Sequence, residues 1–277
     1  MPRAWVLLLL LISAAANGEE WVTLFDGESL DGWTPKIRGY PAGDNFADTF
    51  RVEDGAITVA YDGYETFDDR FGHLFYEIPY SHYRLRLQYR FFGEQAAGGP
   101  DWAWRNSGVM FHAQPPQSMP DKQDFPISIE LQFLGGREDG TPRPTAAMCS
   151  PGTEVEFDGV RADRHCVPAE APTIVGDDWV DVELLVEGAQ RAVHYVSGEP
   201  VIEYGNLAYG GGVVSGHDPA MKPDGEALDS GYIALQSESH PIQFRRIELL
   251  ILKGCMDPAA TNYGAYFVAS DPGSCRY

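Results

Sequence analysis

The stretch RLRLQYRF, residues 84–91, alternates between polar and apolar side chains at every position. Because successive side chains of an extended chain point to opposite faces, this alternation predicts a strand with one buried face. The same period-two pattern recurs in ISIELQF, residues 127–133, and in VDVELLV, residues 180–186. Strands of this kind are typical of antiparallel sheets that cover a core with one face.

Tight turns separate the expected strands. Further strands are expected at residues 50–59, 192–204, 232–236 and 244–252. Asp54-Gly55 and Ser197-Gly198 would each close a hairpin within the first two of these segments. The chain carries 30 glycines and 20 prolines, and no segment keeps a 3.6-residue apolar period over three turns. These features predict an all-β fold, a jelly-roll β-sandwich of two antiparallel sheets.

The beginning of the chain has the features of an export signal. Arg3 precedes a leucine-rich apolar run, Val6 to Ile12, which is too short to span a bilayer. Ala14 to Ala16 fit an A-x-A cleavage site. The sequence therefore predicts an exported protein, periplasmic or extracellular. The expected organisation is a signal peptide, one jelly-roll domain and a cysteine-framed tail, at residues 1–18, 19–253 and 254–277.

The charge of the chain argues against nucleic-acid partners. Forty-one acidic residues face 20 basic ones, which gives a formal net charge of -21 at pH 7. Such a surface repels phosphate backbones. No segment after the export signal is expected to cross a membrane, and the oligomeric state does not follow from the sequence.

Four cysteines are present, Cys149, Cys166, Cys255 and Cys275. Export permits disulfides, and four cysteines allow three pairings. Proximity in the sequence favours Cys149–Cys166 and Cys255–Cys275. A zinc site is disfavoured, because no C-x₂-C pair is present.

One sheet face carries the first candidate site. The apolar residues of the 127–133 strand face the core, so Ser128, Glu130 and Gln132 project from the other face. A carboxylate at the centre of a polar row suits a concave sugar-binding face, although an ordinary solvated sheet face has the same pattern. Long loops, where binding sites commonly lie, are expected at residues 114–124, 135–144 and 210–226.

A second candidate strand follows the sequence Asn106-Ser107-Gly108. Alternation would place Gly108, Met110 and His112 on one face. His112 is either a general acid or base near neutral pH or a structural hydrogen-bonding residue. Trp102 and Trp104 precede this strand, and their rings suit either stacking on a pyranose or packing in the core.

Several catalytic motifs are absent from the sequence. There is no G-x-S-x-G elbow, H-E-x-x-H helix, P-loop or calcium-binding loop. The sequence predicts no cofactor and no metal site; a divalent cation remains compatible with the carboxylates but has no motif. A carboxylate pair for glycoside chemistry would have to come from different strands, and Glu130 and Glu238 are its candidates.

Four stretches together resemble the 3-keto-disaccharide hydrolase domain family, formerly domain of unknown function 1080. They cover about residues 22–252 and read LFDGESLDGW at 24–33, NSGV at 106–109, ELQ at 130–132, and GYIALQ at 231–236 followed by FRRI at 244–247. Cys149 and His165-Cys166 match a subset of the family, which supports a Cys149–Cys166 disulfide. The tail resembles a short "GC-x-DP-x-A-x-NY" module that ends in Cys275.

The resemblance implies a concanavalin A-like jelly roll that cleaves 3-keto-glycosides. In this chemistry a base removes the C2 proton, the anomeric substituent leaves by β-elimination, and water adds. Glu130 or His112 is the expected base, and Arg245 is a further electrostatic candidate. The expected substrate-binding residues are Asn106, Ser107, Gln132, Arg143, Gln236, Glu238 and Trp104. The sequence departs from the family where many members read LQDH, because Glu238 replaces the usual His or displaces it.

Three functions remain open at this stage. The first is a glycoside-cleaving hydrolase or lyase that acts on 3-keto-sugars. The second is a non-catalytic, lectin-like carbohydrate-binding module. The third is a structural or adhesive surface protein that uses residues 254–277 for attachment.

Overall fold

The computed structural model describes residues 19–277, and the predicted signal peptide lies outside the described residues. Residues 19–277 form strands and short 3₁₀ turns without an α-helix. None of the helical turns in this part of the chain is long and apolar enough to cross a membrane. The 3₁₀ turns are η1 (Phe46–Asp48), η2 (Asp101–Ala103), η3 (Pro116–Ser118), η4 (Pro219–Met221) and η5 (Pro272–Ser274).

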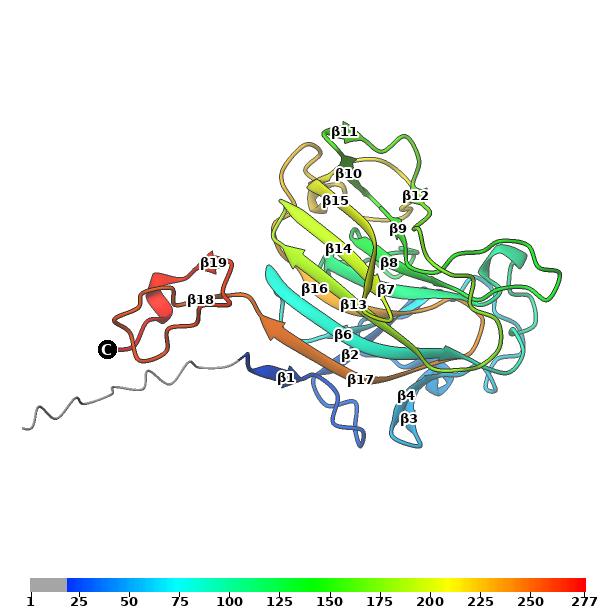
Figure 1. Cartoon of the computed structure of the whole chain (residues 1–277). Helices are drawn as coiled ribbons and strands as arrows, with labels where there is room; N and C mark the ends of the chain where they lie inside the picture. The colour runs from blue at the N-terminus through cyan, green and yellow to red at the C-terminus, as the bar shows by residue number, and fades with distance from the viewer. Residues whose placement is uncertain (1–18) are drawn as a thin grey trace, which may run out of the picture.

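Two large antiparallel sheets pack against each other, as Figure 1 shows. The larger sheet has the order β11-β10-β15-β14-β13-β6-β17-β4-β3, with β1 also paired to β17. Its strands are β1 (Trp21–Thr23), β3 (Phe50–Glu53), β4 (Ala56–Val59), β6 (His82–Phe91), β10 (Thr153–Phe157), β11 (Val160–Arg161), β13 (Val180–Glu187), β14 (Arg191–Val196), β15 (Glu199–Tyr209) and β17 (Ile242–Ile251).

The smaller sheet has the order β12-β9-β8-β7-β16-β5-β2. Its strands are β2 (Trp33–Ile37), β5 (Gly72–Tyr76), β7 (Asn106–Ala113), β8 (Ile129–Leu134), β9 (Ala147–Cys149), β12 (Cys166–Val167) and β16 (Tyr232–Ser237). The predicted all-β, concanavalin A-like jelly-roll sandwich is thereby confirmed. Both predicted hairpins are also present, as β3–β4 and β14–β15.

The alternating stretch at 84–91 lies at the centre of the larger sheet. It forms most of β6, which pairs with β13 on one side and with β17 on the other. Leu85, Leu87 and Tyr89 are buried between the sheets. The Tyr89 ring stacks on Phe133 of the smaller sheet, with ring centroids 4.0 Å apart. The polar residues face outward, where Arg84 pairs with Glu183 at 2.6 Å.

A bulge in β7 turns His112 to the opposite face of the sheet from the one predicted. The pairing of β16 with β7 shifts register between Tyr232 and Ala234, and His112 has a φ of 49°. Met110 stays on the outer side, where it packs with Phe75. His112 instead lies 3.2 Å from the Gly188 carbonyl oxygen, in the turn between β13 and β14 of the larger sheet. The expectation that His112 shares a face with Met110 is therefore wrong.

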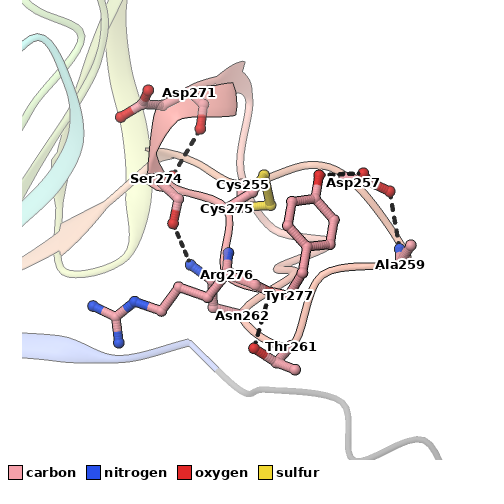
Figure 2. Close-up of a disulfide and its surroundings, with 10 residues drawn as sticks. All are labelled: Cys255, Asp257, Ala259, Thr261, Asn262, Asp271, Ser274, Cys275, Arg276 and Tyr277. Carbon is pink, nitrogen blue, oxygen red and sulfur yellow. Dashed lines mark hydrogen bonds between the residues drawn. A yellow bond between two sulfur atoms is a disulfide. The ribbon is translucent and has the colours of Figure 1, made fainter.

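Both expected disulfides are present. Cys149–Cys166 joins the paired strands β9 and β12. Cys255–Cys275 closes the C-terminal unit that follows β17 (Figure 2). In this unit β18 (Lys253–Gly254) pairs in parallel with β19 (Ala269–Ser270). Inside this unit the Asn262 amide group donates a hydrogen bond to the Ser274 carbonyl oxygen and accepts one from the Arg276 backbone N–H, on either side of Cys275. In Figure 1 the unit lies beyond the last residue of β17.

Candidate active site

A cavity of about 300 Å³ lies on the outer face of the smaller sheet. Four polar side chains line the cavity. Asn106, Glu130 and Gln132 lie on the sheet, and Glu238 directly follows β16. The other lining residues are Trp102, Phe125, Pro151, His165, Cys166 and Val213. The cavity therefore combines apolar walls with a few polar groups, which is typical of small-molecule sites.

Two larger hollows on the molecule are less suited to a ligand. One, of about 440 Å³, lies along β10 and β15, where Arg161 pairs with Glu154 at 2.8 Å. The other, of about 520 Å³, lies on the larger sheet, where Arg86 pairs with Glu248 at 2.8 Å. In each hollow these charged side chains already pair with each other. The cavity on the smaller sheet differs because several of its buried polar atoms have none among the described residues.

Gly108 makes room for the Glu130 side chain. The two residues lie on neighbouring strands, β7 and β8, with Gln132 directly opposite Gly108. A Cβ atom added to Gly108 would lie 2.6 Å from Glu130 Oε1, which is closer than such atoms approach. The carboxyl group of Glu130 therefore lies over the bare backbone of Gly108. This contact gives a physical reason for glycine in the NSG motif.

The Glu130 carboxyl group is buried and has an unpartnered oxygen. The residue is 5 % exposed, and its Oε1 has no hydrogen-bond partner within residues 19–277. Burial raises the pKa of Glu130 well above its usual value, and the nearby Glu238 carboxyl group raises it further. A carboxyl group in this environment favours its protonated form near neutral pH.

Glu238 is the second buried carboxyl group of the cavity. It directly follows β16, is 3 % exposed, and has an Oε2 atom without a partner in the described part of the chain. Burial raises its pKa to about 8, while the positive charge of Arg143 acts in the opposite direction. The Arg143 guanidinium group donates hydrogen bonds to the carbonyl oxygens of Trp102, Arg105 and Gly135. Arg143 thus supports the cavity wall without lining the cavity.

Three predicted amide side chains gather at this site. Asn106 and Gln132 line the cavity, and Asn106 Oδ1 lacks a partner among residues 19–277. Gln236 lies beside Gly108, because Leu235 pairs with Val109. Its Oε1 is likewise unpartnered within the described chain. An unmade hydrogen bond at a buried polar group costs about 1–3 kcal/mol, so these atoms favour a ligand that supplies partners.

Other residues expected at the site lie elsewhere. The Ser107 hydroxyl group donates to the Gln236 carbonyl oxygen, which ties β7 to β16. The face of the Trp104 ring is occupied by guanidinium groups, with that of Arg137 at 5.0 Å. Arg245 lies on the outer face of the larger sheet, stacked on Trp179 at 3.9 Å. His112 points toward the larger sheet and does not line the cavity.

Several residues that line the cavity were not among the expected substrate-binding residues, although Trp102 was a candidate for stacking on a sugar. Trp102, rather than Trp104, forms a wall; it is 52 % exposed and stacks on Phe71. Phe125 and Val213 come from loops that approach the sheet from its outer side. Loop residues have no periodicity that would indicate their direction, so only the position of the loops was predictable.

His165 and Cys166 also line the cavity. Together with Cys149 they are the only residues in 19–277 that place three potential metal-ligand atoms within 4.8 Å of one another. Both sulfur atoms are joined in the Cys149–Cys166 disulfide. With its sulfur atoms in a disulfide, this cluster forms a rigid wall of the cavity. The wall lies beside Glu130, because Glu130 on β8 is opposite Cys149 on β9.

Known proteins share this fold. The chain is similar to two structures from Parabacteroides distasonis described as candidate glycosyl hydrolases. The first has 17 % identity and a TM-score of 0.50 and covers 84 % of this chain and 100 % of its own. The second has 16 % identity and a TM-score of 0.48 and covers 84 % and 94 %. A carbohydrate-binding module, CBM66, from Bacillus subtilis has 10 % identity, a TM-score of 0.43 and coverage of 79 % and 95 %.

The family assignment comes from the sequence comparison. No curated protein matches the chain. The family described as the 3-keto-alpha-glucoside-1,2-lyase-like domain matches residues 20–250, nearly the whole of the sandwich. This match confirms the resemblance seen in the sequence motifs. The chain therefore belongs to the 3-keto-alpha-glucoside-1,2-lyase-like domain family.

Proposed function

We propose that this protein is an exported enzyme that cleaves 3-keto-glycosides, with Glu238 as the base and Glu130 as the acid. The observation that carries the proposal is the pair of buried carboxyl groups in one cavity. Glu238, with a pKa of about 8, becomes ionised as the pH rises toward 8, while Glu130 keeps its proton because burial and the Glu238 charge raise its pKa well above the usual value. Arg143 stabilises the negative charge of Glu238 specifically, which favours Glu238 as the carboxylate.

The reaction needs one ionised and one protonated carboxyl group. The C3 ketone acidifies the C2 proton, which the Glu238 carboxylate removes, and the C2–H electron pair forms an enolate. The enolate collapses to a C1–C2 double bond, the C1–O bond breaks, and Glu130 gives its proton to the departing oxygen. Water then adds to C1 while C2 regains a proton, which completes a hydrolysis. The amide groups of Asn106 and Gln132 supply N–H donors for the enolate oxygen.

This assignment departs from the expectation that Glu130 or His112 is the base. His112 does not line the cavity, so it has no route to a proton on the bound sugar. Glu238 replaces or displaces the histidine that many family members carry in the corresponding LQDH motif, and either side chain can act as a base. The two disulfides are compatible with a periplasmic or extracellular location, as the predicted signal peptide requires.

The test compares 3-keto-glucosides and their unoxidised parents as substrates of the mature protein. The wild type should release the aglycone from the keto sugars only. Glu238→Gln should lower kcat by about 10²–10⁴-fold for every leaving group and abolish exchange of the C2 proton with D₂O in NMR spectra. Glu130→Gln should keep the exchange, and a nitrophenyl leaving group should largely restore its rate, because a good leaving group needs no acid.

Glu203→Gln serves as the control, since Glu203 lies on the larger sheet and pairs with Arg191 at 2.8 Å. Its activity should equal that of the wild type. If no substrate is cleaved and unoxidised sugars raise the melting temperature instead, the protein is a carbohydrate-binding module and the proposed reaction is wrong. If Glu130→Gln rather than Glu238→Gln loses C2 exchange, the two roles are reversed.

A further inference from the structure

A fully buried histidine lies on the same sheet face as the cavity and has no hydrogen-bond partner among the described residues. His73, in the middle of β5, is 0 % exposed, and neither ring nitrogen has a hydrogen-bond partner in the described structure. Its ring lies near those of Phe75 and Phe125, with centroids 6.2 and 6.0 Å away. Burial and the positive charge of Lys36 lower the pKa of His73 to about 3, so the imidazole is neutral. A neutral imidazole offers one donor and one acceptor.

The pairing of the strands connects His73 with the cavity. Lys36 on β2 lies opposite His73, and His73 lies opposite Gln236 on β16. Gln236 lies next to Gly108, over which the Glu130 carboxyl group is placed. The outward-facing side chains of this row therefore lead from the catalytic pair, past Gln236, to His73. Gln236 is also buried with an unpartnered oxygen, when only residues 19–277 are considered.

Phe125 separates His73 from the cavity. Its ring lines the cavity and meets the His73 ring edge-on. The backbone before it is anchored, because Asp124 accepts hydrogen bonds from the backbone N–H and the hydroxyl group of Ser215. The Phe125 ring is partly buried against the core and contacts the rings of Phe71 and His73, with centroids 5.0 and 6.0 Å away. Rotation of this side chain would join the cavity to the unpartnered atoms beneath it.

We propose that His73 and Gln236 form an inner subsite that binds a pair of neighbouring hydroxyl groups on the leaving group of the substrate, a neutral sugar or other polyol. The identification of the bound part as the leaving group rests on the proposed function. A neutral imidazole and an amide match hydroxyl groups, which both donate and accept hydrogen bonds. One N–H of the Lys36 ammonium group donates to the Tyr40 carbonyl oxygen at 2.6 Å.

The test uses His73→Leu, which removes both nitrogens with little change in volume, and two substrates that differ only in the leaving group. KM for a 3-keto-disaccharide should rise about tenfold, while kcat/KM for the methyl 3-keto-glucoside should stay unchanged. The melting temperature should stay equal or rise, because an apolar replacement removes two unmade hydrogen bonds. His73→Gln, which keeps a donor and an acceptor, should recover part of the lost affinity.

His194→Leu is the matched control for stability. His194 is also 0 % exposed, but its nitrogens lie 2.9 Å from the Ala146 carbonyl oxygen and 2.7 Å from the Tyr204 hydroxyl group. The melting temperature of His194→Leu should therefore fall below that of the wild type. An equal change for both substrates in His73→Leu, or a fall in melting temperature like that of His194→Leu, would show that His73 is structural and would overturn the subsite.

Failure of the proposed reaction can be separated from failure of the subsite. If the wild type cleaves neither keto sugar, the unoxidised disaccharide and methyl glucoside are titrated while the ¹⁵N resonances of the His73 ring are followed. A shift with the disaccharide alone supports the subsite without catalysis. The absence of a shift with either sugar overturns it.

Discussion

At the scale of single residues, the proposed catalytic pair depends on the lack of a side chain at Gly108. Gly108 allows the Glu130 carboxyl group to lie over β7, 2.6 Å from where a Cβ atom would be. The same Cβ atom would lie 2.9 Å from the Leu131 carbonyl oxygen, in the strand β8 that is paired on both sides. A methyl group at this position would therefore displace the Glu130 carboxyl group and press on the backbone of β8.

Gly108→Ala tests this geometry. We expect kcat/KM for a 3-keto-glucoside to fall about 10²-fold, the effect of misplacing a reacting group by about 1 Å, with the far-UV circular dichroism spectrum unchanged. Gly212→Ala is the control, because a Cβ atom there meets nothing within 4 Å. Unchanged activity in Gly108→Ala would mean that the position of Glu130 is not critical.

At the scale of elements, the two disulfides have different relations to the cavity. Cys149–Cys166 fixes β9 and β12 at the edge of the smaller sheet, and Cys166 lines the cavity. Cys255–Cys275 lies in the unit beyond β17. The cavity residue Glu238 lies before the start of β17, and this strand of 10 residues extends over roughly 30 Å at about 3.3 Å per residue. The second disulfide is therefore far from the site.

Replacing each cysteine pair with alanines should separate these roles. The Cys149→Ala/Cys166→Ala variant should lose about 2–4 kcal/mol of unfolding free energy and at least tenfold in kcat/KM. The Cys255→Ala/Cys275→Ala variant should keep full activity. Urea unfolding measures the unfolding free energy. Aglycone release, at a temperature where each variant is folded, measures kcat/KM. Equal losses of activity would show that the C-terminal unit contributes to the site.

At the scale of the whole molecule, the outer faces of the two sheets differ. The larger sheet covers its outer face with paired charges, such as Arg84 with Glu183 and Arg86 with Glu248. The smaller sheet instead carries the buried carboxyl groups of Glu130 and Glu238, each with one oxygen that has no partner within residues 19–277. The site thus lowers the stability of the folded protein, and this cost should depend on pH.

The sign of this dependence follows from proton binding. In the folded protein Glu238 has a pKa near 8, against 4.5 for the unperturbed group, so the folded state binds more protons between these values. Its contribution to stability is therefore lost as the pH rises from 4.5 to 8. Glu238→Gln should match the wild type near pH 4.5 but have a melting temperature at least about 2–4 °C higher at pH 8, the effect of roughly 1 kcal/mol. A difference that does not change with pH would contradict this assignment.

Much of the fold was predictable because the alternation of polar and apolar residues shows where strands lie and which of their faces is buried. The pattern at 84–91 specified a strand with a buried apolar face, and β6 has that face. The same rule placed Glu130 and Gln132 on the outer side of β8. The disulfides were predictable from sequence proximity, and the family from the order of four motifs.

The partners of each strand were decided only by the tertiary structure. Alternation gives the face on which a side chain lies but not its neighbours, so the row that joins His73 to Gln236 could not be predicted. A bulge reversed the direction of His112, and loop packing selected Trp102 over Trp104 for the cavity wall. Strand register, bulges and loop directions depend on contacts between residues far apart in the chain, whereas the periodicity of a strand is local.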